Sequence, residues 1–185
     1  IEPRLMANGS MVQSIIVEND GEYRTVEGFG QKRDYTALSK QEIRDIVKEA
    51  GIVGLGGAGF PTNVKLAPKN EEEIDYVIVN GAECEPYLTS DSRVMLEQPE
   101  KVVGGLKVIL QLFDKAKGVI GIEENKPEAI RILSELVKDE PRIQVCTLKT
   151  KYPQGGERFL LYAVTGGREI NSTMLPADAG CTVDN

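Results

Sequence analysis

The stretch Ile74-Asp-Tyr-Val-Ile-Val-Asn80 is the first of three short runs rich in β-branched residues, and these runs predict the fold. The other two are Val119-Ile-Gly-Ile122 and Ile143-Gln-Val-Cys-Thr-Leu148. Nearly continuous apolar runs are typical of strands buried on both faces, as in a parallel sheet. Helical patterns separate the runs. The sequence therefore predicts an α/β fold of three layers, a parallel sheet with helices on both faces.

The expected helices cover residues 39–50, 92–113, 127–138 and 157–164, with a short helix after Pro61. Ser39 and Glu42 have the spacing of a capping box, which marks the start of the first helix. Pro99 and the Gly104–Gly105 pair weaken the second. Right-handed crossovers place the C-terminal ends of parallel strands at one edge of the sheet, where such folds bind ligands.

The N-terminal part of the chain differs from the rest because it contains little apolar sequence. A β-like segment at Ser14–Glu18 precedes Asn19-Asp-Gly21, a strong turn signal. We expect residues 1–35 to form a β segment and residues 36–185 to form the α/β domain. The chain begins with Ile1 and stops after Asn185 without a terminal helix, so we expect an internal piece of a longer protein.

Composition excludes several classes of function. The 185 residues carry a formal net charge of −7, which argues against a nucleic-acid-binding surface. Histidine is absent, which excludes imidazole bases, triads and ligands. The three cysteines lie far apart, at Cys84, Cys146 and Cys181, so we expect reduced thiols and no metal site. No run approaches the roughly 20 apolar residues of a membrane span.

Residues 51–62, Gly-Ile-Val-Gly-Leu-Gly-Gly-Ala-Gly-Phe-Pro-Thr, contain five glycines. Glycine backbones can take left-handed dihedrals and turn several N–H groups toward one anion, as a nucleotide or flavin phosphate requires. Gly54, Gly56 and Gly59 also fit the pattern G-x-G-x-x-G. A dinucleotide fingerprint follows a strand, however, and this segment follows a helix. A linker or a helix cap at Gly51 is the alternative, and the number of glycines favours a binding loop.

Polar residues follow two of the predicted strands. Glu83 and Glu85 lie just after the first, and ionised carboxylates suit ribose hydroxyls or an amide NH₂ better than phosphates. Tyr152 follows the third strand and offers a flat ring for stacking on a flavin or nicotinamide, shortly before a helix that starts at Glu157. The alternatives are a solvated acidic turn and a tight turn with an exposed ring. Lys65, after the glycine loop, is placed to reach a phosphate.

Four strings in the chain resemble one family: Gly54-Leu-Gly-Gly-Ala-Gly-Phe-Pro-Thr62, Asn80-Gly-Ala-Glu-Cys-Glu-Pro-Tyr87, Thr150-Lys-Tyr-Pro-Gln-Gly-Gly-Glu157 and Leu175-Pro-Ala-Asp178. They resemble the C subunit of the Rnf ion-translocating electron-transport complex, which is similar to the flavoprotein subunit of respiratory complex I. The resemblance covers essentially the whole chain. It implies the end of a barrel-sandwich module, up to about Gly28, followed by a complex I flavoprotein-like FMN domain.

The resemblance implies a domain that binds FMN and NADH, in which hydride passes from NADH to the flavin and single electrons pass on to iron–sulfur clusters. By position, the residues implied for the FMN phosphate side are Gly54, Gly56, Gly57, Ala58, Gly59 and Lys65. The residues implied for the flavin ring, the ribityl chain and the NADH cleft are Asn80, Glu83, Glu85, Tyr152, Gly155, Glu157, Asp184 and Asn185. No side chain is expected to be catalytic, since hydride transfer is the chemistry of the cofactor.

The resemblance also implies a place in a membrane-associated NADH:ferredoxin oxidoreductase, on the cytoplasmic side of the membrane. Its partners would be the other subunits, NADH and, indirectly, ferredoxin, with no nucleic acid. The 4Fe-4S clusters would lie beyond Asn185, and the chain alone is expected to be inactive. Leu55, Ala82 and Gly156 replace charged residues of the complex I pattern, in agreement with the Rnf branch. The alternative is a flavin-free scaffold or docking module of a related redox complex.

Overall fold

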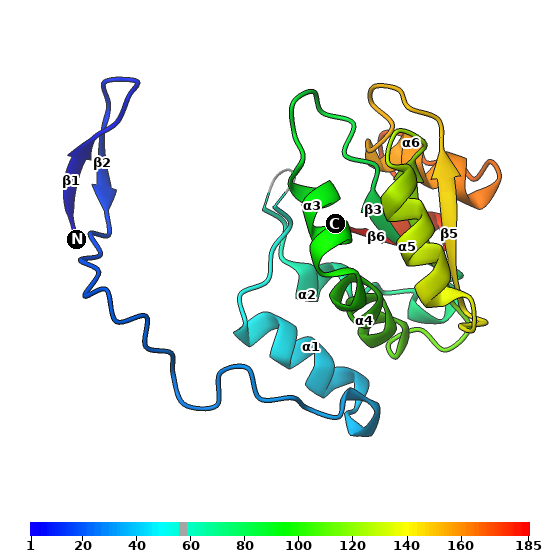
Figure 1. The fold of residues 1–185 in the computed structure, drawn as a ribbon, viewed down its shortest axis with the longest axis horizontal. Helices are drawn as coiled ribbons and strands as arrows, with labels where there is room; N and C mark the ends of the chain where they lie inside the picture. Colours follow the sequence, from blue (N-terminus) through cyan, green and yellow to red (C-terminus); the bar gives the residue numbers. More distant parts are fainter. Residues whose placement is uncertain (56–58) are drawn as a thin grey trace. The chain divides into compact units, whose positions relative to one another are not determined.

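The computed structural model describes residues 1–55 and 59–185, which divide into two units, Ile1–Arg33 and Asp34–Asn185 (Figure 1). The elements of the second unit are, in chain order, α1 (Lys40–Glu49), α2 (Thr62–Lys65), β3 (Tyr76–Gly81), α3 (Ser90–Glu97), α4 (Pro99–Leu110), β4 (Lys117–Glu123), α5 (Pro127–Val137), β5 (Ile143–Leu148), α6 (Glu157–Thr165) and β6 (Cys181–Asp184). Short 3₁₀ turns occur at Tyr35–Ala37, Glu71–Glu73 and Pro176–Ala179. None of the described helices is long and apolar enough to cross a membrane.

The first unit contains an antiparallel hairpin of β1 (Glu2–Leu5) and β2 (Met11–Ser14). The predicted strand at Ser14–Glu18 is wrong, because residues 15–18 lie outside both strands. The turn signal that matters is Asn8-Gly9. Gly9 has a φ of +83°, and the Asn8 side chain accepts a hydrogen bond from the Ser10 N–H at 3.0 Å. Asn-Gly is the dipeptide that closes tight hairpins most readily.

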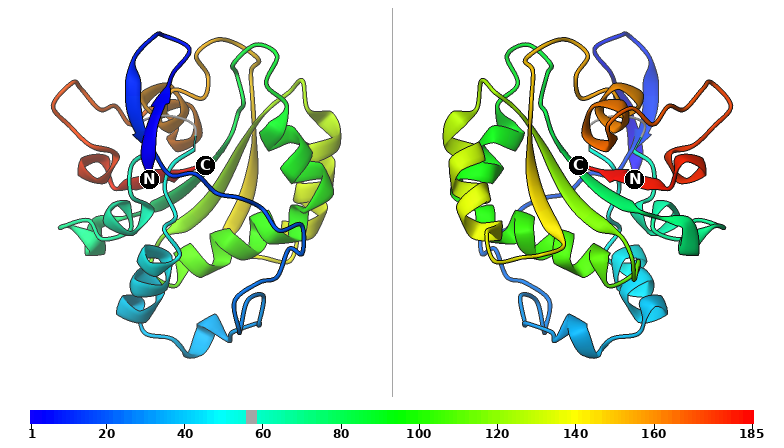
Figure 2. Two further views of the ribbon diagram at one scale, coloured as in Figure 1. Left: turned by 90° about the vertical axis from the view of Figure 1, so that its left-hand side faces the viewer. Right: turned by 90° about the vertical axis from the view of Figure 1, so that its right-hand side faces the viewer.

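The second unit contains a sheet of four parallel strands in the order β5-β4-β3-β6. Val77 of β3 lies opposite Gly118 of β4 on one side and Thr182 of β6 on the other. Figure 2 shows β3, β4 and β5 side by side in a twisted sheet. The predicted parallel α/β fold is confirmed, and the three predicted strands are its β3, β4 and β5.

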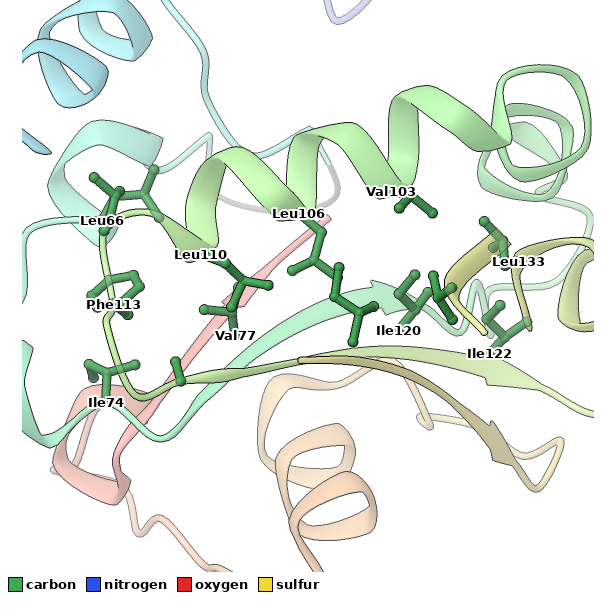
Figure 3. Packing of buried hydrophobic residues seen from close by; sticks show 14 of the residues in the cluster. Leu66, Ile74, Val77, Val103, Leu106, Leu110, Phe113, Ile120, Ile122 and Leu133 are labelled. Atoms are coloured by element: carbon green, nitrogen blue, oxygen red, sulfur yellow. The ribbon is translucent and has the colours of Figure 1, made fainter. Parts of the chain in front are cut away.

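Helices cover both faces of this sheet, as predicted. The helix α4 packs on one face, where Leu106 and Leu110 meet Val77 and Ile120 (Figure 3). The helix α6 lies on the opposite face, where Leu160 joins a second buried cluster around Ile78 and Val119. Successive strand residues alternate between the two clusters, as the two-residue period of a strand requires.

The prediction of one long helix at residues 92–113 is wrong, because the chain forms two helices, α3 and α4, with a break at Gln98. Proline has no N–H and restricts the preceding residue, so Pro99 starts a new helix. Gln98 accordingly leaves the helical region, with φ −138° and ψ 46°. The Gly104–Gly105 pair lies inside α4 without interrupting it.

The capping box that opens α1 is confirmed. The Glu42 N–H donates to Ser39 Oγ at 3.3 Å, and the Ser39 N–H donates to Glu42 Oε2 at 2.8 Å. The strand β6 was not predicted from the sequence. It has only four residues, and its pairing partner β3 lies about a hundred residues earlier in the chain, so no local pattern announces it.

Two glycine substitutions should have opposite effects on the free energy of unfolding. A Cβ at Gly121 in β4 would lie 2.9 Å from Leu160 Cδ1 and 3.1 Å from Leu148 Cδ1. Gly121→Ala is therefore expected to destabilise the chain by about 1–3 kcal/mol through overpacking. Gly105→Ala meets nothing within 4 Å in α4 and should stabilise it by about 0.5–1 kcal/mol. Urea unfolding of both variants checks this, and equal effects would contradict the packing described here.

Candidate functional site

The strand order defines where a ligand would bind. From β3 the chain adds β4 and then β5 on one side, and it returns through α6 to place β6 on the other side of β3. In open parallel sheets, ligands bind in the crevice at the C-terminal ends of the strands where the order reverses. That point lies between β3 and β6. Asn80 near the end of β3 and Asp184 at the end of β6 are placed there.

Lys65 brings a positive charge to this reversal point. Its Nζ donates a 2.6 Å hydrogen bond to the carbonyl oxygen of Val183 in β6 and lies 3.9 Å from Glu157 Oε1 at the start of α6. The side chain is 30% exposed. An ammonium group has three donors, so this contact with Val183 leaves others for an anion.

The residues on either side of the central glycines pair with each other. The Gly54 N–H donates to Phe60 O at 3.0 Å, and Val53 forms an antiparallel bridge with Pro61. Gly59 has a φ of +64°. Gly56, Gly57 and Ala58 lie outside the described residues.

Gly51 has a separate role, because it follows α1 with a φ of +65° and donates its N–H to Lys48 O at 3.0 Å. It is the left-handed glycine that ends that helix. The structure thus shows a helix end at Gly51, while a role of the following glycines in binding stays a prediction.

Gly155 joins the loop after β5 to the loop after β3. Its N–H donates to Cys84 Sγ at 3.2 Å, and its carbonyl oxygen accepts from Asn80 Nδ2 at 2.9 Å. A Cβ at this position would lie 3.3 Å from Asn80 Oδ1 and 3.4 Å from Cys84 Sγ. The loops approach closely only because residue 155 has no side chain.

A buried polar residue precedes Gly155 in the chain. Gln154 is buried, and its Oε1 has no hydrogen-bond partner among the described residues. A buried acceptor without a partner is costly, and a donor on a bound ligand would satisfy it. Burial also raises the pKa of Asp184, an effect that the nearby charge of Lys65 opposes. Asn185, the next residue, is exposed.

A hollow of about 440 Å³ lies at the C-terminal ends of β3, β4 and β5. Its lining residues are Glu83, Cys84, Glu85, Pro86, Tyr87, Leu88, Thr89, Ser92, Glu123, Asn125, Lys126, Thr150, Lys151 and Tyr152. The Tyr152 ring is 68% exposed, so a flat face is available there. The predicted residues Glu83, Glu85 and Tyr152 thus share one hollow.

The two glutamates of the loop after β3 have different surroundings. The Glu83 carboxylate accepts from the N–H groups of Asp91 at 2.7 Å and Ser92 at 3.2 Å, so it caps α3. Glu83 also has a left-handed φ of +47°. Among the described residues, no hydrogen bond or ion pair engages the Glu85 carboxylate, and the residue is exposed. Glu85 is therefore the carboxylate available to a ligand.

Sequence reasoning missed Glu123 and Lys126, which line the hollow from the end of β4. Their position at the end of a buried strand could have identified them, as it did Glu83 and Tyr152. Glu123 ends β4 and Lys126 follows it, so they reach the same edge of the sheet. It also missed the contact of the Cys84 thiol with Gly155, which depends on tertiary packing.

Residues 47–185 match the family described as the Nuo51 FMN-binding domain. The chain belongs to this family. It is 48% identical over 173 residues to the C subunit of the proton-translocating ferredoxin:NAD(+) oxidoreductase complex of Clostridium ljungdahlii, covering 94% of this chain and 37% of that protein. It is 46% identical over 188 residues to the Na(+)-translocating counterpart of Acetobacterium woodii, covering 100% of this chain and 42% of that protein.

The C subunit of the ion-translocating oxidoreductase complex of Pseudomonas aeruginosa is 40% identical over 179 residues, which cover 97% of this chain and 23% of that protein. The chain thus spans less than half the length of these relatives. The resemblance to the Rnf C subunit, drawn from the four motifs, is confirmed.

The fold is also similar to that of solved structures. A crystal structure of the NAD+-reducing NiFe-hydrogenase in the air-oxidized state has a TM-score of 0.67 at 22% identity, covering 80% of this chain and 28% of that chain. The same protein in the H2-reduced state gives a TM-score of 0.64 at 22% identity, covering 80% and 29%. This likeness supports the fold class.

The residues at the reversal point fit the FMN that the family's description names. Lys65 supplies a cation for a phosphate. The hydrogen bond between Gly54 and Phe60 lies a few residues before it in the sequence. The buried Gln154 Oε1, which has no partner among the described residues, is an acceptor for an N–H donor of the flavin.

The different surroundings of the two glutamates can be tested on stability. Glu83→Ala removes the acceptor of two helix N–H groups and should lower the free energy of unfolding by about 1–2 kcal/mol. Glu85→Ala, two residues away and exposed, should change it by less than about 0.5 kcal/mol. Urea unfolding monitored by circular dichroism measures both, and equal losses would refute the cap.

Proposed function

We propose that the chain is the flavin- and NADH-binding part of an Rnf-type NADH:ferredoxin oxidoreductase. The observation that carries the proposal is the position of Lys65, whose ammonium reaches the reversal point between β3 and β6 in a chain of the Nuo51 FMN-binding domain family. The hollow with Glu85 and Tyr152 opens at the same edge of the sheet. A cationic phosphate site and a carboxylate-bearing hollow at one edge suit a flavin next to a dinucleotide.

The proposed FMN ligands comprise backbone groups of the glycine loop, one cation and residues at the strand ends. They are Gly54, Gly56, Gly57, Ala58, Gly59, Lys65, Asn80, Asp184 and Asn185. Lys65 would donate to the phosphate, and glycine N–H groups would surround it. When bound, FMN supplies the change from two-electron hydride chemistry to single-electron transfer.

The proposed NADH cleft is built from the loops after β3 and β5. Glu85 would accept hydrogen bonds from ribose hydroxyls, and the Tyr152 ring would stack on a flat ring of the dinucleotide. Glu83 would shape the cleft by capping α3. Gly155 and Glu157 do not line the hollow itself and would border the cleft on the side of Lys65, which lies 3.9 Å from Glu157 Oε1. The residues bind and orient, and none is required as a proton donor.

In the complete complex, the chain would act with other subunits on the cytoplasmic side of the membrane. Electrons would leave the flavin singly, through 4Fe-4S clusters held elsewhere, toward ferredoxin. Support comes from the relatives, whose names describe them as C subunits of ferredoxin:NAD(+) oxidoreductase complexes. Among the described residues, no group of three or more His, Cys, Asp or Glu side chains is arranged to hold a metal ion.

The FMN assignment can be tested at Lys65. Lys65→Ala should weaken FMN binding about 10- to 100-fold, because a charge-assisted hydrogen bond to phosphate is lost. Lys69→Ala, a change at an exposed lysine four residues later, should leave the affinity unchanged. Quenching of flavin fluorescence on titration of the full chain gives both affinities. Equal affinities in wild type and Lys65→Ala would remove Lys65 from the site, and a wild type without flavin affinity would favour the docking module.

The NADH assignment can be tested at Glu85. Glu85→Gln keeps the shape of the side chain but removes its charge, and it should weaken NADH binding about tenfold while FMN affinity stays unchanged. Glu72→Gln, at an exposed glutamate of a 3₁₀ turn, is the matched control. Separate titrations of the two ligands measure the effect. A loss of FMN affinity equal to that of NADH would contradict separate subsites.

A further inference from the structure

Glu123 and Lys126 form a buried ion pair at the C-terminal end of β4, the strand between β3 and β5. Glu123 Oε2 lies 3.6 Å from Lys126 Nζ, and the two side chains are 1% and 10% exposed. Neither residue belongs to the four motifs that carry the family resemblance. Both line the hollow.

The pair binds the backbone of both neighbouring loops. Lys126 Nζ donates to Ala82 O at 2.9 Å and lies 3.5 Å from Glu83 O, in the loop after β3. Glu123 Oε1 accepts from the Lys151 N–H at 3.1 Å, in the loop after β5. One ion pair at the C-terminal end of β4 thus connects the two loops that flank it.

Stability alone does not account for a pair in this position. Removing two charges from water is costly, and buried ion pairs are often replaced by apolar residues without loss of stability. What charged groups provide here is directional hydrogen bonds to specific backbone atoms. Each contact fixes the position of a loop rather than filling space.

The two loops carry the residues assigned to the dinucleotide. Glu85 follows the backbone that Lys126 holds, and Tyr152 directly follows Lys151. The Glu83 carboxylate holds the same loop from its other side by capping α3. The Glu123–Lys126 pair thus contacts the backbone close to Glu85 on one side of the hollow and close to Tyr152 on the other.

We propose that Glu123 and Lys126 are positioning residues of the dinucleotide cleft, acting through the loops after β3 and β5. The inference rests on the proposed function for the identity of the ligand, and it adds the residues that arrange the ligand's cleft. Functional groups that bind ligands need such support, because a displacement of about 1 Å can cost a large factor in binding or rate.

The test variant is the double substitution Glu123→Gln/Lys126→Met, which removes both charges at similar size and leaves no single buried charge. The matched control is Glu135→Gln/Lys138→Met, which removes an ion pair of the same i,i+3 spacing on α5 whose side chains are 66% and 56% exposed. Two quantities are measured on the full chain, the NADH and FMN affinities by separate titration and the hydrogen-exchange rates of the loops after β3 and β5.

In the test variant, NADH affinity should fall about tenfold, with FMN affinity and the control variant unchanged. Amide exchange should accelerate in the two loops and not elsewhere in the sheet. Wild-type NADH affinity together with wild-type exchange in the two loops would overturn the proposal.

If the wild-type chain binds no NADH, the proposed function fails. The amide hydrogen-exchange rates alone then decide whether the Glu123–Lys126 pair positions the two loops. If the double variant does not fold, Glu123→Gln decides by the same measurements, because the remaining Lys126 ammonium keeps Ala82 O at 2.9 Å and Asn125 Oδ1 at 3.2 Å as acceptors. It keeps an acceptor for the Lys151 N–H and should still weaken NADH binding about threefold.

Discussion

The parallel pairing of β6 with β3 is the constraint on which the site depends. By joining the edge of β3 opposite β4, β6 reverses the strand order at the C-terminal ends of the two strands, where open parallel sheets bind ligands. The same pairing places the Val183 carbonyl where Lys65 can donate to it, at 2.6 Å. A lysine far away in the sequence thereby becomes part of the sheet edge. The connection through α6 also supplies the second helical layer.

The site has two parts of different chemistry at one sheet edge. Lys65 provides a cation at the reversal point, which suits an anion. The hollow provides the exposed Glu85 carboxylate and the Tyr152 ring, which suit hydroxyls and a flat ring. Gly155 lies at the boundary, where its backbone contacts Asn80 and Cys84. Lys126 and Glu123, at the end of β4, hydrogen-bond the backbone of the loops on the two sides of the hollow.

Sequence patterns predicted the elements whose cause is local. The Ser39 capping box starts α1 as expected, and the three apolar runs form β3, β4 and β5. Where the structure departs from the predicted elements, another local rule decides. Pro99 divides the helix predicted at residues 92–113, and Asn8-Gly9 places the hairpin earlier than residues 14–18. The motifs also led to the family, which the match of residues 47–185 confirms.

The sequence by itself determined the α/β class, the parallel strands and the identity of most residues at the strand ends, because periodicity and turn chemistry are local properties. Only the tertiary structure decided how those residues divide their roles. Glu83 caps a helix and Glu85 is left free because α3 begins beside the first and not the second. The partners of Lys65, Glu123 and Lys126 are likewise set by packing between distant segments, and no local sequence pattern encodes that packing.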